Sequence, residues 1–188
     1  MSRGRVFVIS SPSGGGKTTV IEALREKNRD LCYSVSATTR DPRPGEVNGR
    51  DYYFLKEDEF LRKIEENAFI EWARVHNFYY GTPRDQIEKY LGEGKKVILD
   101  IDVQGGLKIK EQIPDSVLIF LLPPSMDELR KRLIQRGTEE EEILRVRLEN
   151  AKKEIDMADR YDYQVINDIL DETVRELDSI INRNNIKK

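Results

Sequence analysis

Short apolar runs alternate along the chain with segments whose apolar residues recur at helical spacing. The short runs predict buried strands at Val6–Ile9, Lys96–Ile101, Val117–Leu122 and Val165–Ile166. The segments with helical spacing predict helices at Thr18–Lys27, Val103–Gln112, Ser125–Arg136 and Asp171–Asn182. Strands that alternate with helices predict an α/β fold, in which helices cover both faces of a parallel sheet.

Two stretches interrupt this alternation. Residues 34–82 are rich in aromatic residues and arginine, and they predict a small mixed α/β insert with short strands and one helix, Glu57–Asn67. We expect Phe69 and Trp72 to lie in its core rather than to stack on a ligand. Residues 137–142, a glycine followed by a threonine and four glutamates, predict a short lid between two helices. The remaining residues, 1–33, 83–136 and 143–188, form the core of a single predicted domain.

Composition narrows the function classes. A chain of 188 residues fits one domain, and 32 basic against 35 acidic residues give a net charge of −3, which argues against a protein that coats nucleic acid. The single cysteine, Cys32, excludes an intrachain disulfide, and we expect it to fill a small core position ahead of a strand. The opening apolar run is too short for a signal peptide or a membrane span. We therefore expect a cytoplasmic protein that does not bind membranes.

A glycine-rich segment lies directly between the first predicted strand and the first predicted helix. It reads Ser11-Pro-Ser-Gly-Gly-Gly-Lys17-Thr18, the position and pattern of a phosphate-binding loop. Its backbone N–H groups and the following helix N-terminus favour phosphate, Lys17 would reach the β- and γ-phosphates, and Thr18 would bind Mg²⁺. Ser11 replaces the usual first glycine, which is acceptable where φ is negative. The predicted ATP-binding residues here are Ser13, Gly14, Gly15, Gly16, Lys17, Thr18 and Thr19.

Further motifs give the sequence a specific resemblance. They are Ser34–Tyr52, Glu71-Trp-Ala, Tyr80-Gly-Thr and Leu99–Gly105, which together resemble the guanylate kinase family. The likeness runs in the family's order from the first strand to Asn167-Asp168. It implies a P-loop NTPase-type fold and the ATP-dependent phosphorylation of GMP to GDP, with Mg²⁺ as cofactor and ATP as co-substrate.

The resemblance also implies where the phosphate of GMP binds. Arg40 and Arg43, separated by a stiff Asp-Pro, can present two guanidinium groups to one dianionic phosphate. Tyr52 and Tyr80 can each add a hydrogen bond, and the family holds the GMP phosphate at these four positions. Taken alone, two arginines beside a proline turn are better explained as solvent-facing residues.

Guanine recognition is assigned by the same likeness. Guanine offers N–H donors at N1 and N2, and one carboxylate can accept from both. Glu71 resembles the glutamate that reads guanine in the family, while Ser36 and Thr82 supply hydroxyl groups towards O6 and Asp102 assists. A site built on such hydrogen bonds rejects mismatched bases. The alternative for Glu71 is a salt-bridged strand residue.

Residues outside the insert complete the predicted site. Asp100 ends an apolar strand and would orient Mg²⁺ through water. Arg136 and Arg147 match lid arginines that stabilise the transferring phosphoryl group, and Asn167 matches a position beside the adenine of ATP. Arg132 and Arg145 could instead be surface residues.

Two other functions compete with this assignment. One is a monophosphate kinase specific for AMP, dTMP or UMP, against which Glu71, Ser36 and Thr82 argue. The other is a non-catalytic guanylate-kinase-like module that binds phosphopeptides, against which the intact Lys17 and Thr18 argue. The expected partners are the nucleotides ATP and GMP, with dGMP as a further candidate, and both a monomer and a homodimer fit the sequence.

Overall fold

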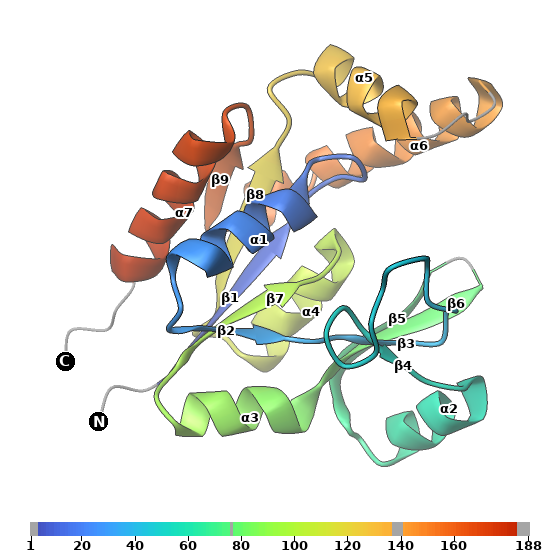
Figure 1. Cartoon of the computed structure of the whole chain (residues 1–188), viewed down its shortest axis with the longest axis vertical. Helices are drawn as coiled ribbons and strands as arrows, with labels where there is room; N and C mark the ends of the chain where they lie inside the picture. The colour runs from blue at the N-terminus through green and yellow to red at the C-terminus, as the bar shows by residue number, and fades with distance from the viewer. Residues whose placement is uncertain (1–3, 76, 137–140, 184–188) are drawn as a thin grey trace.

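The computed structural model of the chain describes residues 4–75, 77–136 and 141–183, apart from the side chain of Arg136 (Figure 1). Its central layer is a five-stranded sheet with the strand order β2-β7-β1-β8-β9. Every neighbouring pair is parallel. The strands are β1 (Arg5–Ser10), β2 (Leu31–Ser34), β7 (Lys96–Asp100), β8 (Val117–Leu122) and β9 (Tyr163–Ile166).

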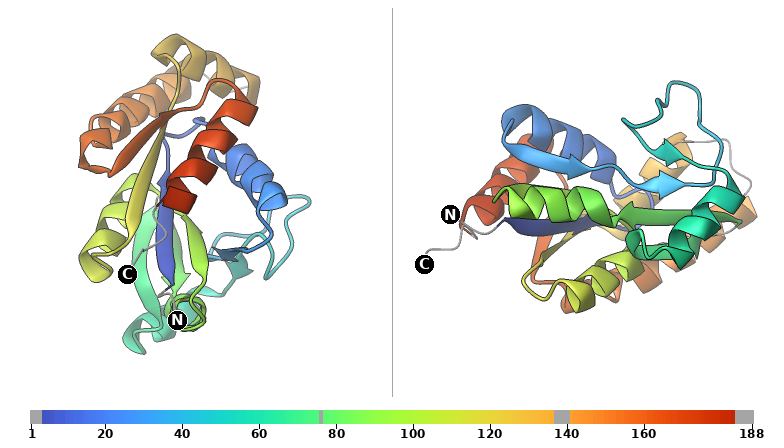
Figure 2. Two further views of the ribbon diagram at one scale, coloured as in Figure 1. Left: turned by 90° about the vertical axis from the view of Figure 1, so that its left-hand side faces the viewer. Right: turned by 90° about the horizontal axis from the view of Figure 1, so that it is seen from below.

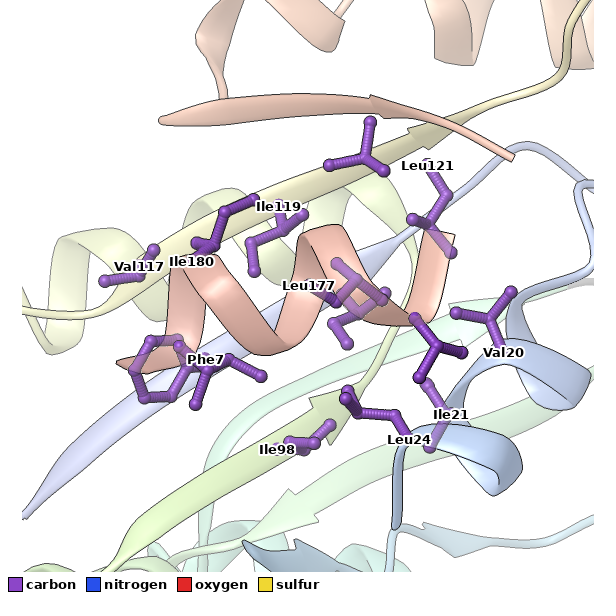
Figure 3. Packing of buried hydrophobic residues seen from close by; sticks show 14 residues of the cluster. Phe7, Val20, Ile21, Leu24, Ile98, Val117, Ile119, Leu121, Leu177 and Ile180 are labelled. Carbon is purple, nitrogen blue, oxygen red and sulfur yellow. The ribbon is translucent and has the colours of Figure 1, made fainter. Parts of the chain in front are cut away.

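Helices cover both faces of this sheet because its strands are apolar on both sides. Phe7 and Ile9 of β1 point to one face, where they pack with α1 (Lys17–Lys27) and α7 (Leu170–Arg183), as Figure 3 shows for Leu24 and Leu177. Val6 and Val8 point to the other face. That face is covered by α3 (Arg84–Gly92) and α4 (Val103–Gln112), through Ile87 and Ile109 among others. The predicted fold class is thus confirmed.

A second sheet follows β2 in the chain and has the strand order β4-β3-β6-β5. Its strands are β3 (Ala37–Thr38), β4 (Tyr53–Phe54), β5 (Phe69–Val75) and β6 (Phe78–Pro83). The helix α2 (Glu57–Glu65) covers this sheet, and the ring of its buried Phe60 stacks on Phe69 with centroids 4.5 Å apart. Strand β5 of this sheet packs against α4, where Lys108 Nζ donates a hydrogen bond of 3.0 Å to Trp72 O. In the right-hand view of Figure 2 this sheet and α2 lie beyond the end of α3.

A helix pair follows β8. The helices α5 (Met126–Arg136) and α6 (Glu141–Ile155) pack together through Leu129 and Leu133 on one side and Leu144 and Ala151 on the other. A short 3₁₀ turn, η1 (Ala158–Arg160), leads into β9. In Figure 1 the α5–α6 pair and the second sheet extend from the same end of the parallel sheet, the end at which β1 passes into α1.

Most predicted elements are present, with bounds shifted by at most two residues. Sequence periodicity did not predict β2 or α3, and Cys32, expected ahead of a strand, lies within β2. Phe69 is 4% exposed, as expected, but the prediction that Trp72 lies in the core is wrong. Trp72 is 41% exposed because it lies on the edge strand β5, flanked by Tyr79 at a centroid distance of 6.1 Å.

No helix in the described part of the chain combines the length and the apolar character needed to cross a membrane.

Candidate active site

The glycine-rich loop takes the backbone conformation that its sequence predicts. Gly14 and Gly16 have φ of 85° and 86°, a region that side chains disfavour. A Cβ on Gly16 would also lie 2.6 Å from Asn167 Nδ2, so only glycine fits there. Among the described non-glycine residues, Asn67 alone has positive φ. Ser11 therefore occupies the place of the usual first glycine without strain.

The lysine of the loop turns back towards the end of β7. Lys17 Nζ lies 2.8 Å from Asp100 Oδ1 and donates a hydrogen bond of 2.8 Å to the carbonyl oxygen of Ile101. The structure thus brings together the predicted phosphate-binding lysine and the predicted metal-orienting acid. Thr18 lies exposed at the start of α1 and lines the same cavity as both.

One cavity of about 280 Å³ lies between the phosphate loop and the second sheet. Most of its lining comes from residues that the sequence singled out for three different tasks, phosphate binding, Mg²⁺ binding and base recognition. They are Lys17, Thr18, Ser36, Tyr52, Glu71, Tyr80, Asp100 and Asp102. The cavity therefore has the predicted base-reading carboxylate of Glu71 and the predicted phosphate-binding Lys17 on its walls.

Glu71 enters this cavity from β5. The pairing of β5 with β6 shifts its register between Phe69 and Glu71, and such bulges re-aim side chains, here Phe69 beneath α2 and Glu71 into the cavity. Glu71 is 8% exposed, and its Oε1 accepts a hydrogen bond of 2.6 Å from the hydroxyl of Thr82. Burial raises the pKa of the Glu71 carboxyl group. No salt bridge of Glu71 is present among the described residues.

The residues around Glu71 shape the pocket. Thr82 is 1% exposed and lies behind Glu71. Its hydroxyl group donates its hydrogen bond to the Glu71 carboxylate. Asp102 caps α4 by accepting a hydrogen bond of 2.7 Å from Gly105 N. A Cβ on Gly105 would lie 3.1 Å from Glu71 Oε2, so glycine leaves room at that oxygen.

The predicted phosphate-binding group is only partly assembled around the cavity. Tyr52 and Tyr80 meet edge to face with ring centroids 6.2 Å apart, and the guanidinium carbon of Arg40 lies 5.5 Å from the Tyr52 ring centroid. Burial raises the pKa of Tyr52 to about 12, which keeps its hydroxyl group a donor. Neither Arg40 nor Arg43 lines the cavity itself, and Arg43 is exposed.

Glu46 is a residue of this group to which the sequence gave no role. Its two carboxylate oxygens each accept a hydrogen bond of 2.9 Å from Arg40, and Oε2 also accepts one of 2.6 Å from Arg43 N. The hydrogen bonds from Arg40 are the main cause that lowers the pKa of Glu46. Glu46 thereby fixes the guanidinium group of Arg40 and the turn that carries Arg43.

A second cavity, of about 250 Å³, lies beside the start of α1. Gly14, Gly16, Thr19, Arg132 and Asn167 are among its lining residues. Asn167 is 6% exposed, and its Nδ2 donates a hydrogen bond of 2.7 Å to Gly15 O, so its side-chain amide braces the phosphate loop. Arg132 is partly buried and donates to Asn167 O at 3.2 Å, which makes it part of this wall rather than a surface residue.

The helix α6 reaches the phosphate loop through one predicted residue. Arg147 Nη2 donates a hydrogen bond of 3.2 Å to Ser13 Oγ. Arg145 is exposed and pairs with Glu142 and Glu149 on the solvent side. Arg136 is the last residue of α5, and its side chain lies outside the described part of the structure, as do residues 137–140 of the predicted lid.

Comparisons with known proteins agree with this geometry. The model of the guanylate kinase family matches residues 3–184. A guanylate kinase of Caldanaerobacter subterraneus is 52% identical over 95% of this chain and 87% of its own length, and one of Clostridium perfringens is 51% identical over 96% and 83%. The crystal structure of guanylate kinase from Anaplasma phagocytophilum, 36% identical, superimposes with a TM-score of 0.83 over 100% of this chain and 89% of that one. The chain therefore belongs to the guanylate kinase family.

Proposed function

We infer that this protein transfers the γ-phosphoryl group of ATP to GMP and so forms ADP and GDP. One observation carries the inference: the buried carboxylate of Glu71 and the phosphate-binding Lys17 line one cavity of about 280 Å³. Family membership and the curated relatives support the same reaction. A different monophosphate kinase and a non-catalytic binding module, the two competing functions, are not favoured.

We propose that the acceptor's base binds at Glu71. The carboxylate accepts guanine N1–H and N2–H₂, with Ser36 and Asp102 on the neighbouring walls. Thr82 supports Glu71 on the side away from the cavity, because its hydroxyl group donates to Glu71 Oε1 and orients the carboxylate. Adenine has an acceptor at N1, so neither N1 nor the facing carboxylate oxygen could donate a hydrogen bond to the other. Leaving buried polar groups without a partner costs binding free energy, so adenine should bind poorly.

The acceptor's phosphate binds, in this proposal, at the open end of the same cavity. Tyr52 and Tyr80 donate hydroxyl hydrogen bonds there, and Arg40, held against the Tyr52 ring, supplies positive charge. Arg43, on the exposed turn, completes the group when the second sheet closes over the nucleotide. An oxygen of the GMP phosphate is itself a competent nucleophile, so the reaction needs no general base.

ATP binds, we propose, on the opposite side of the phosphate loop. Its phosphates lie on the N–H groups of residues 13–19 with Lys17 at the β- and γ-phosphates. Its adenine lies in the cavity formed by Thr19, Arg132 and Asn167. Transfer forms a bond from the GMP oxygen to the γ-phosphorus and breaks the bond to the bridging oxygen of ADP.

Arginines neutralise the charge that develops on the phosphoryl oxygens during transfer. Arg147 already contacts the phosphate loop at Ser13. We propose the same task for Arg136, at the end of α5, and for Arg40 on the acceptor side. Alignment and charge neutralisation, rather than proton transfer, supply the catalysis.

Mg²⁺ fits the donors at this site. Thr18 and Asp100 offer a hydroxyl and a carboxylate oxygen, and Mg²⁺ prefers oxygen ligands and binds with few protein groups beside substrate phosphates and water. Within the described residues no group of three or more acids, histidines and cysteines is placed so that it could hold a metal ion. Thr18, with Asp100 acting through water, would hold the Mg²⁺ ion, which would supply positive charge that offsets the charge of the ATP phosphates.

We also propose a functional division of the chain. Residues 34–82 act as the GMP-binding insert, residues 137–142 act as a lid, and the rest forms the core. Closure of both over the phosphate loop would exclude water, which otherwise competes as phosphoryl acceptor.

A coupled assay of ADP release tests the function directly. The protein is supplied with MgATP and, in turn, GMP, dGMP, IMP, AMP, dTMP and UMP. We expect rapid ADP release with GMP and little with AMP, dTMP or UMP. Equal rates with AMP would refute the role of Glu71, and release without any acceptor would indicate an ATPase.

A further inference from the structure

Glu154, near the end of α6, has no part in the roles above, yet its carboxylate reaches the phosphate loop. Its Oε2 accepts a hydrogen bond of 3.2 Å from the backbone N–H of Ser13. The side chain is partly buried. Burial is the main cause that raises the pKa of Glu154 and the nearby Asp102 raises it further, whereas the Ser13 N–H and the charge of Lys17 lower it.

Glu154 and Arg147 lie on the same edge of α6. They are seven residues apart, which is two helical turns, so their side chains project in nearly the same direction. Arg147 donates to the hydroxyl group of Ser13, and Glu154 accepts from its backbone N–H. One residue of the phosphate loop is thus held by two side chains of α6, one of them catalytic in the proposed function.

The apolar residues of α6 pack elsewhere than on the phosphate loop. Leu144, Leu148 and Ala151 pack against α5, and Ile155 reaches the core of the parallel sheet. The four apolar residues settle which face of α6 is buried. A hydrogen bond to a fixed backbone N–H is directional, and it therefore sets the position of the helix relative to the loop.

We propose that Glu154 is a positioning residue for phosphoryl transfer, acting through Ser13 to hold α6 where Arg147 meets the transferring phosphate. The proposal rests on the proposed role of Arg147. Glu154 itself touches no reacting atom. It fixes the distance between the helix that carries the arginine and the loop that carries the phosphates.

Three substitutions at Glu154 separate its hydrogen bond from its charge. E154Q keeps an acceptor oxygen at the same reach and should retain kcat within about threefold. E154D keeps the charge but is shorter by one methylene group, so it should lose kcat nearly as E154A does, by about ten- to a hundredfold, the range for a hydrogen bond to a charged group. E149A, on the exposed side of α6, is the matched control and should keep wild-type kcat.

The division between kcat and KM excludes a merely structural role. Loosening of the phosphate loop would raise the KM for ATP. We instead expect the KM for ATP to stay unchanged or to fall in E154A, because a negative charge near the phosphates is removed. Melting temperatures of all variants are measured alongside, and if E154A does not fold, the contrast between E154Q and E154D decides.

A double-mutant cycle tests whether Glu154 acts through Arg147. In an R147A background the further change E154A should lower kcat by less than threefold, because the positioned group is already absent. The proposal would be overturned if the kcat losses of R147A and E154A multiplied in the double variant. It would also be overturned if E154D kept wild-type kcat, or if E149A lost as much kcat as E154A. An R147A variant with wild-type kcat would overturn it as well.

Amide hydrogen exchange at Ser13 tests the contact without any assay of activity. The Ser13 amide should exchange faster in E154A and E154D than in the wild type and E154Q. Unchanged protection in E154A would overturn the proposal even if its activity fell. Failure of the wild type to phosphorylate GMP would instead overturn the proposed function, and the exchange experiment would still report on Glu154.

Discussion

The substitution Glu71→Gln tests base recognition most sharply, because it changes one atom of a buried side chain. In the wild type Oε1 accepts from Thr82 at 2.6 Å, and the side chain is 8% exposed. In the variant either the new NH₂ group faces the guanine donors, or it turns towards Thr82 and leaves a neutral oxygen for guanine. Either arrangement removes at least one charge-assisted hydrogen bond.

The size of the effect follows from that lost interaction. A hydrogen bond to a charged group contributes about 1.5–3 kcal/mol, so kcat/KM for GMP should fall by about ten- to a hundredfold. Thr82→Val is the matched control, since it removes the supporting donor and leaves the carboxylate. That hydrogen bond joins two groups of the protein and is not made to the substrate, so its loss should lower kcat/KM for GMP less than Glu71→Gln does.

A comparison of IMP with GMP as the acceptor adds a second test. IMP keeps N1–H and O6 but lacks the 2-amino group, so the wild type should use it much less well than GMP. The gap between GMP and IMP should shrink in Glu71→Gln, which the coupled assay measures as a ratio of kcat/KM values. Equal use of GMP, IMP and AMP by the wild type would refute the reasoning.

Four further outcomes are expected. Lys17→Ala should lower kcat by orders of magnitude while GMP binding, measured by calorimetry, survives; near-normal turnover would contradict the role of the phosphate loop. Arg40→Ala should raise the KM for GMP about ten- to a hundredfold and leave that for ATP unchanged, with a smaller rise for the exposed Arg43→Ala, whereas a loss of ATP affinity would mean that the two sites are misassigned. Because burial raises the pKa of Glu71 and only its ionised form accepts both guanine donors, the KM for GMP should rise as pH falls, from a pH above the ordinary glutamate value of about 4.3. Glu71→Gln should lack that rise, and a rise that persists in it would assign the titration to another group. Small-angle scattering with a bisubstrate analogue should show a more compact particle than without it, and identical profiles would contradict closure.

Periodicity predicted the elements that the core requires and missed those that depend on tertiary context. Strands buried on both faces, such as Val117–Leu122, are visible as apolar runs. The strand Leu31–Ser34 is only half-buried because it forms one edge of the parallel sheet, and its mixed sequence gives no such run. The helix Arg84–Gly92 fully buries one apolar side chain, Ile87, and its helical spacing is correspondingly faint.

The candidate site was predictable residue by residue where a motif covers it. The structure brings Lys17, Glu71 and Asp100 to one cavity, as the motifs imply. Partners that belong to no motif could not be found in this way. The contact between Glu154 and Ser13 joins residues 141 positions apart and depends on how α6 packs, while the bulge that turns Glu71 inwards depends on the register of β5 and β6.

The side-chain amide of Asn167 shows a related limit. The sequence placed it beside adenine, and it does line the second cavity. Its amide nevertheless donates to Gly15 O, and Thr173 donates to its Oδ1 at 3.3 Å. A motif identifies such a residue but does not say whether its polar atoms face the ligand or the loop.

An internal competition measures the central claim most directly. The protein is incubated with MgATP and an equimolar mixture of GMP, AMP, dTMP and UMP, and the diphosphates formed at low conversion are separated by chromatography. Because the product ratios equal the ratios of kcat/KM, the account predicts GDP in at least about a hundredfold excess over dTDP and UDP, as expected for a site that hydrogen-bonds its substrate's donors. Every transfer also releases ADP from ATP, so the use of AMP is measured as loss of AMP, which should be at least about a hundredfold slower than the loss of GMP. Yields of dTDP or UDP comparable to that of GDP, or loss of AMP as fast as that of GMP, would contradict it.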